Sequence, residues 1–186
     1  MIEFKSISLS FDKKEIFNRF SATLPDRGLV LLTGRSGCGK TTLLRIILGL
    51  IKPSDGEVIF SQNIKKVSVV FQEDRLVPTL TTLENVALVS GDAEAEKRLF
   101  EVGLTDAKAL YPAELSGGMK RRVAIARALA FSGDVLILDE AFTGIEEELC
   151  REILAKITDE YKDRLIIAVT HRPSLFKDYD YTEIKI

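Results

Sequence analysis

Alternating and uninterrupted apolar residues recur along the chain, and each pattern predicts a strand. Residues 2–11 alternate imperfectly, which predicts a strand with a bulge, and residues 15–24 predict a second, half-polar strand. Both suit an antiparallel edge. Strands buried on both faces of a sheet carry continuous apolar runs instead. Such runs lie at Leu29–Leu32, Val135–Asp139 and Leu165–Thr170, and shorter strands are expected at Glu57–Phe60 and Val67–Phe71.

Helical patterns fill the spaces between these strands. They are expected at Lys40–Leu50, Thr82–Val89, Ala93–Val102, from Ser116 to about Phe131, and at about Glu146–Tyr161. Asp92 is expected to cap the third of these helices, and Gly103 to end it. Strands that alternate with helices imply a parallel sheet joined by right-handed crossovers.

The segment 72–115 interrupts this alternation and is expected to form a small helical insertion. The length of 186 residues suits one domain. We therefore predict an α/β fold over residues 1–186, with a mostly parallel sheet in a core of about 1–71 and 116–186, an antiparallel β edge and the helical insertion.

Composition and charge argue against several classes of function. The net charge of −2 gives no support to a general nucleic-acid role, so no nucleic-acid partner is expected. A basic cluster at Lys120, Arg121, Arg122 and Arg127 is more typical of a solvated helix face or a partner surface. No apolar run approaches the roughly 20 residues that span a bilayer. The two cysteines lack metal-ligand spacing, which indicates a reducing compartment.

A glycine-rich loop carries the first chemical signal. The loop runs Gly34-Arg35-Ser36-Gly37-Cys38-Gly39-Lys40-Thr41-Thr42 and fits G-x-x-x-x-G-K-[ST] between an apolar strand and a helix. Its backbone N–H groups and the helix N-terminus would bind phosphate oxygens. Lys40 would reach the β- and γ-phosphates, and the Thr41 hydroxyl would bind Mg²⁺. The alternative is a glycine-rich turn that only caps a helix.

Polar residues follow the apolar strands at the sheet edge where ligands bind in such folds. Asp139 is predicted to bind Mg²⁺ through water, and Glu140 to act as general base on the attacking water, unless the pair only caps a helix. His171 is expected to contact the γ-phosphate, and Gln72 to bind Mg²⁺ or orient water. A structural histidine and an exposed glutamine are the alternatives. Phe11 is predicted to stack on a base, or else to belong to the core.

A second glycine turn, Leu115-Ser116-Gly117-Gly118-Met119, lies between the phosphate loop and the acidic pair. This turn is expected to begin a helix and to form a second phosphate-binding turn, in addition to the Gly34–Thr42 loop. The three motifs in this order resemble the ATP-binding subunit of ABC transporters over nearly the whole chain. In that family, Gly34–Thr42 matches the Walker A loop, Gln72 the Q-loop, and Leu115–Met119 the signature. Asp139 and Glu140 end Walker B, His171 matches the switch histidine and Phe11 the adenine-stacking aromatic.

The resemblance implies a P-loop NTPase core that uses ATP and Mg²⁺. It also implies a head-to-tail dimer with a second copy or a homologous subunit, in which the signature of one subunit contacts the ATP held by the other. An integral-membrane permease at the cytoplasmic face of the cell membrane, and indirectly a substrate-binding protein, are the further implied partners. The segment Val70–Pro78, followed by Thr82–Val86, is similar to importer subunits for nitrate, sulfonate, taurine and pyrimidine precursors. The permease is expected to dock between the helical insertion and the core, with Leu76, Val77 and Leu80 as exposed apolar candidates unless they pack internally.

Three departures from the family pattern stand out. The helical insertion is short, with a spacing of 43 residues from Gln72 to Leu115. Glu146 replaces an aspartate in the segment that matches the D-loop, and Arg121 stands where glutamine is common. Soluble ABC ATPases of DNA repair carry a long coiled coil that is missing from the sequence, and translation-associated members join two ATPase domains. A lipoprotein-release or cluster-assembly ATPase remains the alternative to an importer. A catalytically inactive binding module is disfavoured because four residues expected to act on ATP are all present: Lys40, Asp139, Glu140 and His171.

Overall fold

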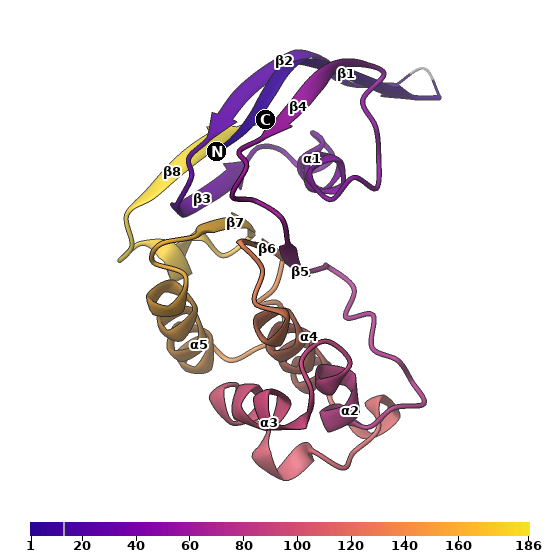
Figure 1. The fold of residues 1–186 in the computed structure, drawn as a ribbon, viewed down its shortest axis with the longest axis vertical. Helices are drawn as coiled ribbons and strands as arrows, with labels where there is room; N and C mark the ends of the chain where they lie inside the picture. The colour runs from indigo at the N-terminus through magenta and orange to yellow at the C-terminus, as the bar shows by residue number, and fades with distance from the viewer. Residues whose placement is uncertain (13) are drawn as a thin grey trace.

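Two β-sheets organise the chain in the computed structural model, which describes residues 1–12 and 14–186 (Figure 1). In this part, a three-stranded sheet has the order β2-β1-β4, and a five-stranded sheet the order β5-β6-β7-β3-β8. The first sheet contains β1 (Ile2–Phe11), β2 (Lys14–Leu24) and β4 (Asp55–Phe60). The second contains β3 (Gly28–Thr33), β5 (Val67–Val70), β6 (Val135–Asp139), β7 (Leu165–Val169) and β8 (Tyr181–Lys185).

The smaller sheet is antiparallel, as predicted from its half-polar strands. β1 pairs with both β2 and β4, and its register against β2 shifts between Phe4 and Ile7, which confirms the predicted bulge. Gly56 in β4 has a φ of 82°, and a Cβ there would lie 2.4 Å from the carbonyl oxygen of Lys5. Only glycine fits where the backbone of β4 approaches that of its paired strand β1 so closely.

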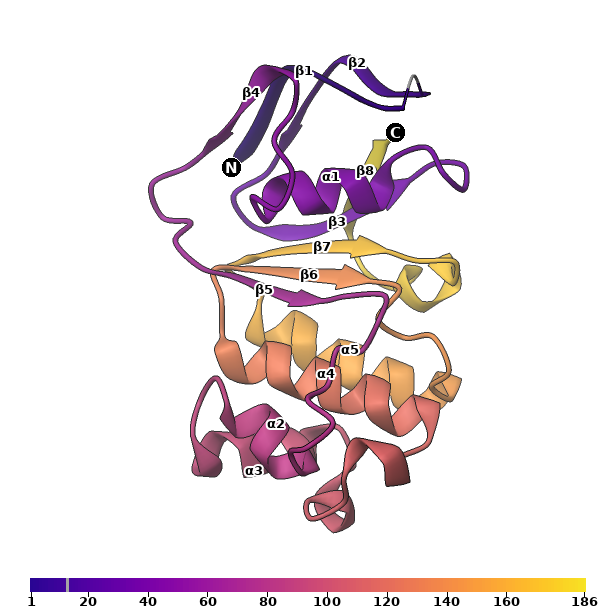
Figure 2. The ribbon, with the colours of Figure 1, turned by 90° about the vertical axis from the view of Figure 1, so that its right-hand side faces the viewer.

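The larger sheet is parallel and separates two hydrophobic cores. Alternate residues of β3 face opposite sides, so Leu29 and Leu31 join one core while Val30 and Leu32 join the other. α1 (Lys40–Ile47) covers one face, with the antiparallel sheet beyond it (Figure 2). α4 (Gly117–Phe131) and α5 (Glu147–Glu160) cover the opposite face. The continuous apolar runs of β3, β6 and β7 follow from this two-sided burial.

Several helix ends differ from the predicted ones. α1 ends at Ile47 rather than Leu50, because Gly49 adopts a left-handed φ of 68°. α3 (Asp92–Glu101) is capped by Gly91, so the prediction that Asp92 is the cap is wrong. Asp92 instead lies in the first turn, where its carboxylate suits the positive end of the helix dipole.

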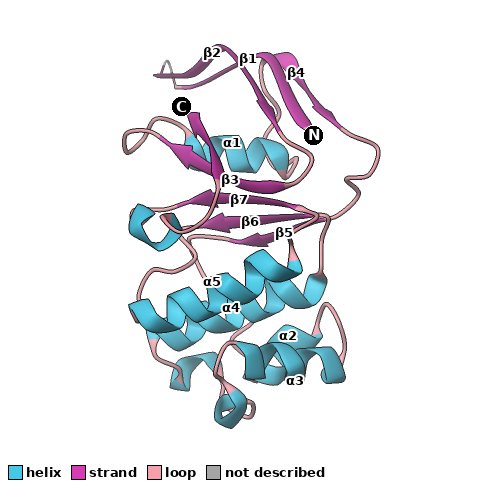
Figure 3. Cartoon of the chain, turned by 90° about the vertical axis from the view of Figure 1, so that its left-hand side faces the viewer, coloured by secondary structure: helices cyan, strands magenta, loops and turns pink. Residues whose placement is uncertain are grey.

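The predicted helical insertion is confirmed. α2 (Thr82–Ala87) and α3 pack against α4 on the side away from the parallel sheet (Figure 3). Short 3₁₀ turns lie at Thr105–Ala107, Pro112–Glu114 and Pro173–Phe176. Across residues 1–12 and 14–186, no helix combines the length and the apolar character needed to cross a bilayer.

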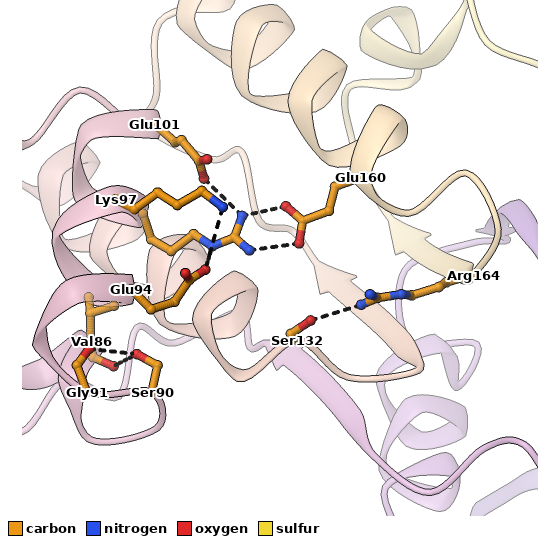
Figure 4. Close-up of polar contacts among 10 residues, drawn as sticks. Val86, Ser90, Gly91, Glu94, Lys97, Glu101, Ser132, Glu160 and Arg164 are labelled. Atoms are coloured by element: carbon orange, nitrogen blue, oxygen red, sulfur yellow. Dashed lines mark hydrogen bonds and ion pairs between the residues drawn. The ribbon is translucent and has the colours of Figure 1, made fainter.

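A buried arginine ties this insertion to the core. Arg98 of α3 donates hydrogen bonds to Glu94 (2.6 Å) and Glu101 (2.9 Å) on its own helix. It also forms a two-pronged pair with Glu160 of α5, with one contact at 2.8 Å (Figure 4). Because α3 belongs to the insertion and α5 to the core, this network joins the two parts of the fold.

Candidate functional site

A cavity of about 290 Å³ opens where β5, β6 and β7 end, beside the N-terminus of α1. Ligands of open α/β folds bind at this edge of the sheet. In the part of the chain that the structure describes, the lining residues are Ile16, Ser36, Gly37, Gly39, Lys40, Thr41, Thr42, Gln72, Asp139, Glu140, Val169 and His171. The structure thus brings together side chains predicted from three separate motifs.

The glycine-rich loop wraps around the side chain of Lys40. Its Nζ donates hydrogen bonds to the carbonyl oxygens of Gly34 (2.9 Å) and Arg35 (3.1 Å), and the N–H of Cys38 donates to Arg35 (3.2 Å). These carbonyl acceptors are neutral, so they hold the Lys40 ammonium group at the cavity and leave its positive charge in place. Such a charge beside a helix N-terminus attracts an anion.

Two glycines of this loop are required by their surroundings. Gly39 caps α1 with a φ of 112°, and a Cβ there would lie 2.8 Å from Ile16. A Cβ on Gly34 would lie 2.6 Å from the carbonyl oxygen of Ile186, next to β8. The loop therefore passes closely between β2 and the chain that follows β8, where only glycine leaves room.

Asp139 is a buried carboxylate with an unfilled bonding position. Its exposed fraction is 3%, and Oδ1 has no hydrogen-bond partner among the described residues. Burial raises the pKa of Asp139, and the charge of Glu140 adds to this rise. The Thr41 hydroxyl and the charges of Arg45 and Lys40 oppose the rise of that pKa. A cation beside Oδ1 would supply the missing partner.

The side chains that line the cavity suit Mg²⁺ bound together with the phosphates of a nucleotide. Thr41, Gln72 and Asp139 line the same cavity and offer hydroxyl, amide and carboxylate oxygens, the hard ligands that Mg²⁺ takes. Over residues 1–12 and 14–186, no group of three or more His, Cys, Asp or Glu side chains forms a complete metal cage. Mg²⁺ usually completes its shell with water and substrate phosphates, so such a cage is not needed.

Glu140 and His171 form a pair at the mouth of the cavity. Nε2 of His171 lies 3.3 Å from Oε1 of Glu140, and the backbone N–H of His171 donates to Oε2 (3.2 Å). The Glu140 side chain is 11% exposed and that of His171 is 75% exposed. Glu140 also has a left-handed φ of 53°, a conformation that non-glycine residues adopt only under constraint. The carboxylate is therefore fixed, while the imidazole reaches into solvent.

The basic cluster after the second glycine turn does not form a solvated helix face. Arg121 is only 8% exposed, and both Arg121 and Arg127 donate to carbonyl oxygens of residues 71–75. Gln72, whose side chain lines the cavity, lies in that segment. The charge pattern alone misled here, because backbone acceptors on a distant loop leave no trace in the local sequence.

The second glycine turn lies away from this cavity. Ser116 caps α4, and its Oγ accepts a hydrogen bond from the N–H of Met119 (3.2 Å). A Cβ on Gly118 would lie 2.5 Å from the carbonyl oxygen of Gly144, so α4 packs directly on the segment after Glu140. None of residues 115–119 is among the described residues that line the cavity.

Phe11 and Ile16 differ in their position relative to the cavity. Phe11 ends β1 with an exposed fraction of 46%, and it is absent from the described lining of the cavity. Ile16 of β2 does line the cavity and packs on Gly39. Ile16 is one of several apolar residues in this half-polar strand, and nothing in its local sequence marks it as a cavity residue.

Comparison with known proteins agrees with these motifs. Residues 17–143 match the family model described as ABC transporter. The chain is 40% identical over 176 residues to the bicarbonate transport ATP-binding protein CmpD of Synechocystis sp., covering 84% of this chain and 62% of that protein. It is 37% identical over 171 residues to the taurine import ATP-binding protein TauB of Rhizobium johnstonii, covering 83% and 65%. The chain thus spans less than two thirds of the length of these relatives.

The fold is similar to solved ATP-binding cassettes. A dimeric post-hydrolysis structure of the ATP-binding cassette MJ0796, bound to ADP and Pi, superposes with a TM-score of 0.85 at 26% sequence identity. The match covers 100% of this chain and 96% of that one. The similarity extends to the antiparallel sheet and the helical insertion, since the whole chain is covered.

Proposed function

Because the chain belongs to the ABC transporter family, we propose that it is an ATP-hydrolysing subunit that drives a membrane permease, as part of a small-solute importer. The observation that carries this proposal is the single cavity shared by Lys40, Asp139 and Glu140. The names of the relatives, which specify bicarbonate transport and taurine import, support import. We treat residues 1–186 as one ABC ATPase domain, with residues 72–115 as its helical part.

ATP binding rests on the glycine-rich loop. Residues Gly34–Thr42 would surround the phosphates with backbone N–H groups, and Lys40 would pair with the β- and γ-phosphate oxygens. Lys40 already stands over the loop through its bonds to Gly34 and Arg35, so little reorganisation is needed. Phe11 is proposed to stack on the adenine ring, and Ile16 offers an apolar wall beside the phosphates.

Thr41, Gln72 and Asp139 would hold Mg²⁺ at the phosphates. Bound there, the ion would neutralise charge on the phosphate oxygens during transfer. The buried Oδ1 atom of Asp139 is available for this contact because it has no hydrogen-bond partner among the described residues.

Glu140 would take a proton from the attacking water. Glu140 lines the cavity, and its carboxylate is held by the backbone N–H and imidazole of His171. His171, being largely exposed, can turn toward a γ-phosphate that occupies the cavity mouth. Loss of a general base commonly costs about 10²–10⁴ in rate.

A head-to-tail dimer would complete each site. Ser116, Gly117 and Gly118 lie away from their own cavity, and Leu115 and Met119 pack toward the core behind them. The N-terminus of α4 is thus available to contact the γ-phosphate held by a second subunit. The dimeric state of the similar MJ0796 cassette supports a dimer.

An apolar cavity is the proposed permease dock. It measures about 250 Å³ and lies between β5 and the end of α4, with Phe71, Val89 and Phe131 in its wall. Leu76, Val77 and Leu80 are half-buried rather than exposed, and Leu76 packs against the core. The permease would therefore contact the cavity wall more than these three side chains. This arrangement would place the subunit at the cytoplasmic face of the membrane, with a substrate-binding protein on the opposite side.

The Glu140→Gln variant tests the ATP-driven dimer. With Mg-ATP, its mass by light scattering should rise from 20.7 kDa toward twice that value, while turnover falls. Lys40→Ala is the matched control, since it removes the phosphate contact and should stay monomeric. A Glu140→Gln chain that binds ATP yet stays monomeric would contradict the dimer.

Purifying the tagged Glu140→Gln variant from native membranes with Mg-ATP tests the transporter. A co-purifying integral-membrane permease is the expected result, and its companion binding protein would identify the solute. Only soluble partners in a sample that dimerises would reject the transporter and favour a soluble ABC ATPase.

A further inference from the structure

Arg121 links the helix that follows the second glycine turn to the segment that contains Gln72. It lies in α4, little more than one turn after the Ser116 cap, and its guanidinium is buried. Nη1 donates to the carbonyl oxygen of Phe71 (2.6 Å), and Nη2 donates to that of Gln72. Nε lies 3.2 Å from Oδ1 of Asp74. One side chain of α4 therefore fixes the segment that follows β5.

Arg127 extends this attachment along the same helix. Its guanidinium donates to the carbonyl oxygens of Asp74 (3.0 Å) and Arg75 (3.0 Å). The backbone of residues 71–75 is consequently held by α4 after it leaves the sheet. Gln72 is the member of this segment whose side chain lines the nucleotide cavity.

An arginine suits these contacts better than the glutamine common in the family. Guanidinium has five N–H donors in a planar fork, whereas a glutamine amide has two on one nitrogen. Two guanidinium nitrogens donate to the carbonyl oxygens of Phe71 and Gln72, and the third lies in an ion pair with Asp74. A glutamine at 121 would lose the ion pair with Asp74, and its single amide nitrogen would have to reach both carbonyl oxygens.

We propose that Arg121 is a positioning residue that couples the second glycine turn to Gln72, so that α4 sets where this amide stands in the nucleotide cavity. The inference rests on the proposed ATPase function, because it concerns the same cavity. In the dimer, the start of α4 meets one ATP while Arg121 positions Gln72 at the other. A displacement of α4 at one nucleotide is thereby passed to the second.

The test compares Arg121→Gln with a matched control, Arg122→Gln, in the full chain. Arg122 is the next residue on α4 and donates to the carbonyl oxygens of Val102 and Gly103, both at 2.8 Å, instead of the Gln72 segment. Steady-state ATP hydrolysis gives kcat and KM, and hydrogen–deuterium exchange without nucleotide reports on residues 71–75.

We expect Arg121→Gln to lower kcat roughly tenfold or more with little change in KM, because misplacing a catalytic group by about 1 Å can cost about 10² in rate. Exchange at residues 71–75 should rise in this variant only. Arg121→Lys keeps the charge with a single donor point and should recover part of kcat. Arg122→Gln should alter exchange near residues 102–103, and its loss of kcat should be smaller than that of Arg121→Gln.

Two results would overturn the inference in distinguishable ways. Equal kcat and equal exchange at 71–75 in Arg121→Gln and Arg122→Gln would reject the coupling while leaving the ATPase function intact. A wild-type chain that neither binds nor hydrolyses Mg-ATP would reject the proposed function, and the coupling with it.

Discussion

The pair between Arg98 and Glu160 should contribute measurably to stability, unlike an ordinary surface pair. The Arg98 side chain is 5% exposed and that of Glu160 is 29% exposed. Burial by itself would lower the pKa of Arg98, but the hydrogen bond and charge of Glu160, together with those of Glu101, raise it above its usual value. Arg98 therefore keeps its charge across the whole accessible pH range.

Replacement of Glu160 by Gln keeps the shape of the side chain and removes its charge. Breaking a fully buried ion pair costs about 3–5 kcal/mol. The loss should be smaller here, about 1–2 kcal/mol, because Glu160 is partly exposed and Glu94 and Glu101 still neutralise Arg98.

A double-mutant cycle isolates the pair. Urea unfolding of wild type, Arg98→Met, Glu160→Gln and the double variant gives four free energies of unfolding, provided that the m-value is unchanged. We expect a coupling energy of about 1–2 kcal/mol. The control pair is Lys108–Glu96, which is 3.0 Å long with side chains 30% and 52% exposed. Its coupling should stay below about 0.5 kcal/mol, as for other surface pairs.

Equal coupling energies for the two pairs would refute this reasoning. That outcome would mean that the partial exposure of Glu160 screens the interaction as effectively as bulk water. The connection between α3 and α5 would then depend on apolar packing, with the ion network contributing only geometry.

Three further predictions address the site and the acid stability of the chain. Ser116→Arg should abolish ATP turnover while fluorescent ATP still binds, because the turn lies outside the cavity of its own chain; normal turnover would mean that the turn is not used. Alkylation of Cys38, which is half-buried in the phosphate loop, should slow when ATP is added, and buried Cys150 serves as the unreactive reference. Equal alkylation rates with and without ATP would mean that bound ATP does not cover Cys38. Two backbone N–H groups donate to Asp134 and lower its pKa, so its stabilising contribution is present above its unfolded pKa of about 3.9 and is lost as pH falls through the lower folded pKa. Acid unfolding followed by circular dichroism should thus be steeper for wild type than for Asp134→Asn, and superimposable curves would contradict this assignment.

The parts of the fold that local pattern determines were predictable. The apolar runs of β3, β6 and β7 exist because these strands are buried on both faces, and the residues that follow them had to meet at one edge. Lys40, Gln72, Asp139, Glu140 and His171 consequently lie together as predicted, whereas their chemical roles remain predictions.

The parts that depend on distant contacts were not predictable. β8 is mostly exposed and lacks an apolar run, and it pairs with β3, a strand far away in the sequence. Arg98 and Arg121 are charged residues buried by partners far away in the sequence. Nothing in their immediate neighbours distinguishes them from arginines on a solvated surface.

The left-handed backbone conformation of Glu140 creates a trade-off between stability and activity at this position. A non-glycine residue with this φ costs about 1–2 kcal/mol, and glycine would remove that strain while adding back about 0.5–1 kcal/mol of chain entropy. Glu140→Gly would relieve this strain but lose the contacts of the carboxylate with His171, so its stability should stay near that of wild type while the carboxylate is lost. The strained residue is also the proposed general base, so the backbone cost falls on the group that the proposed chemistry needs.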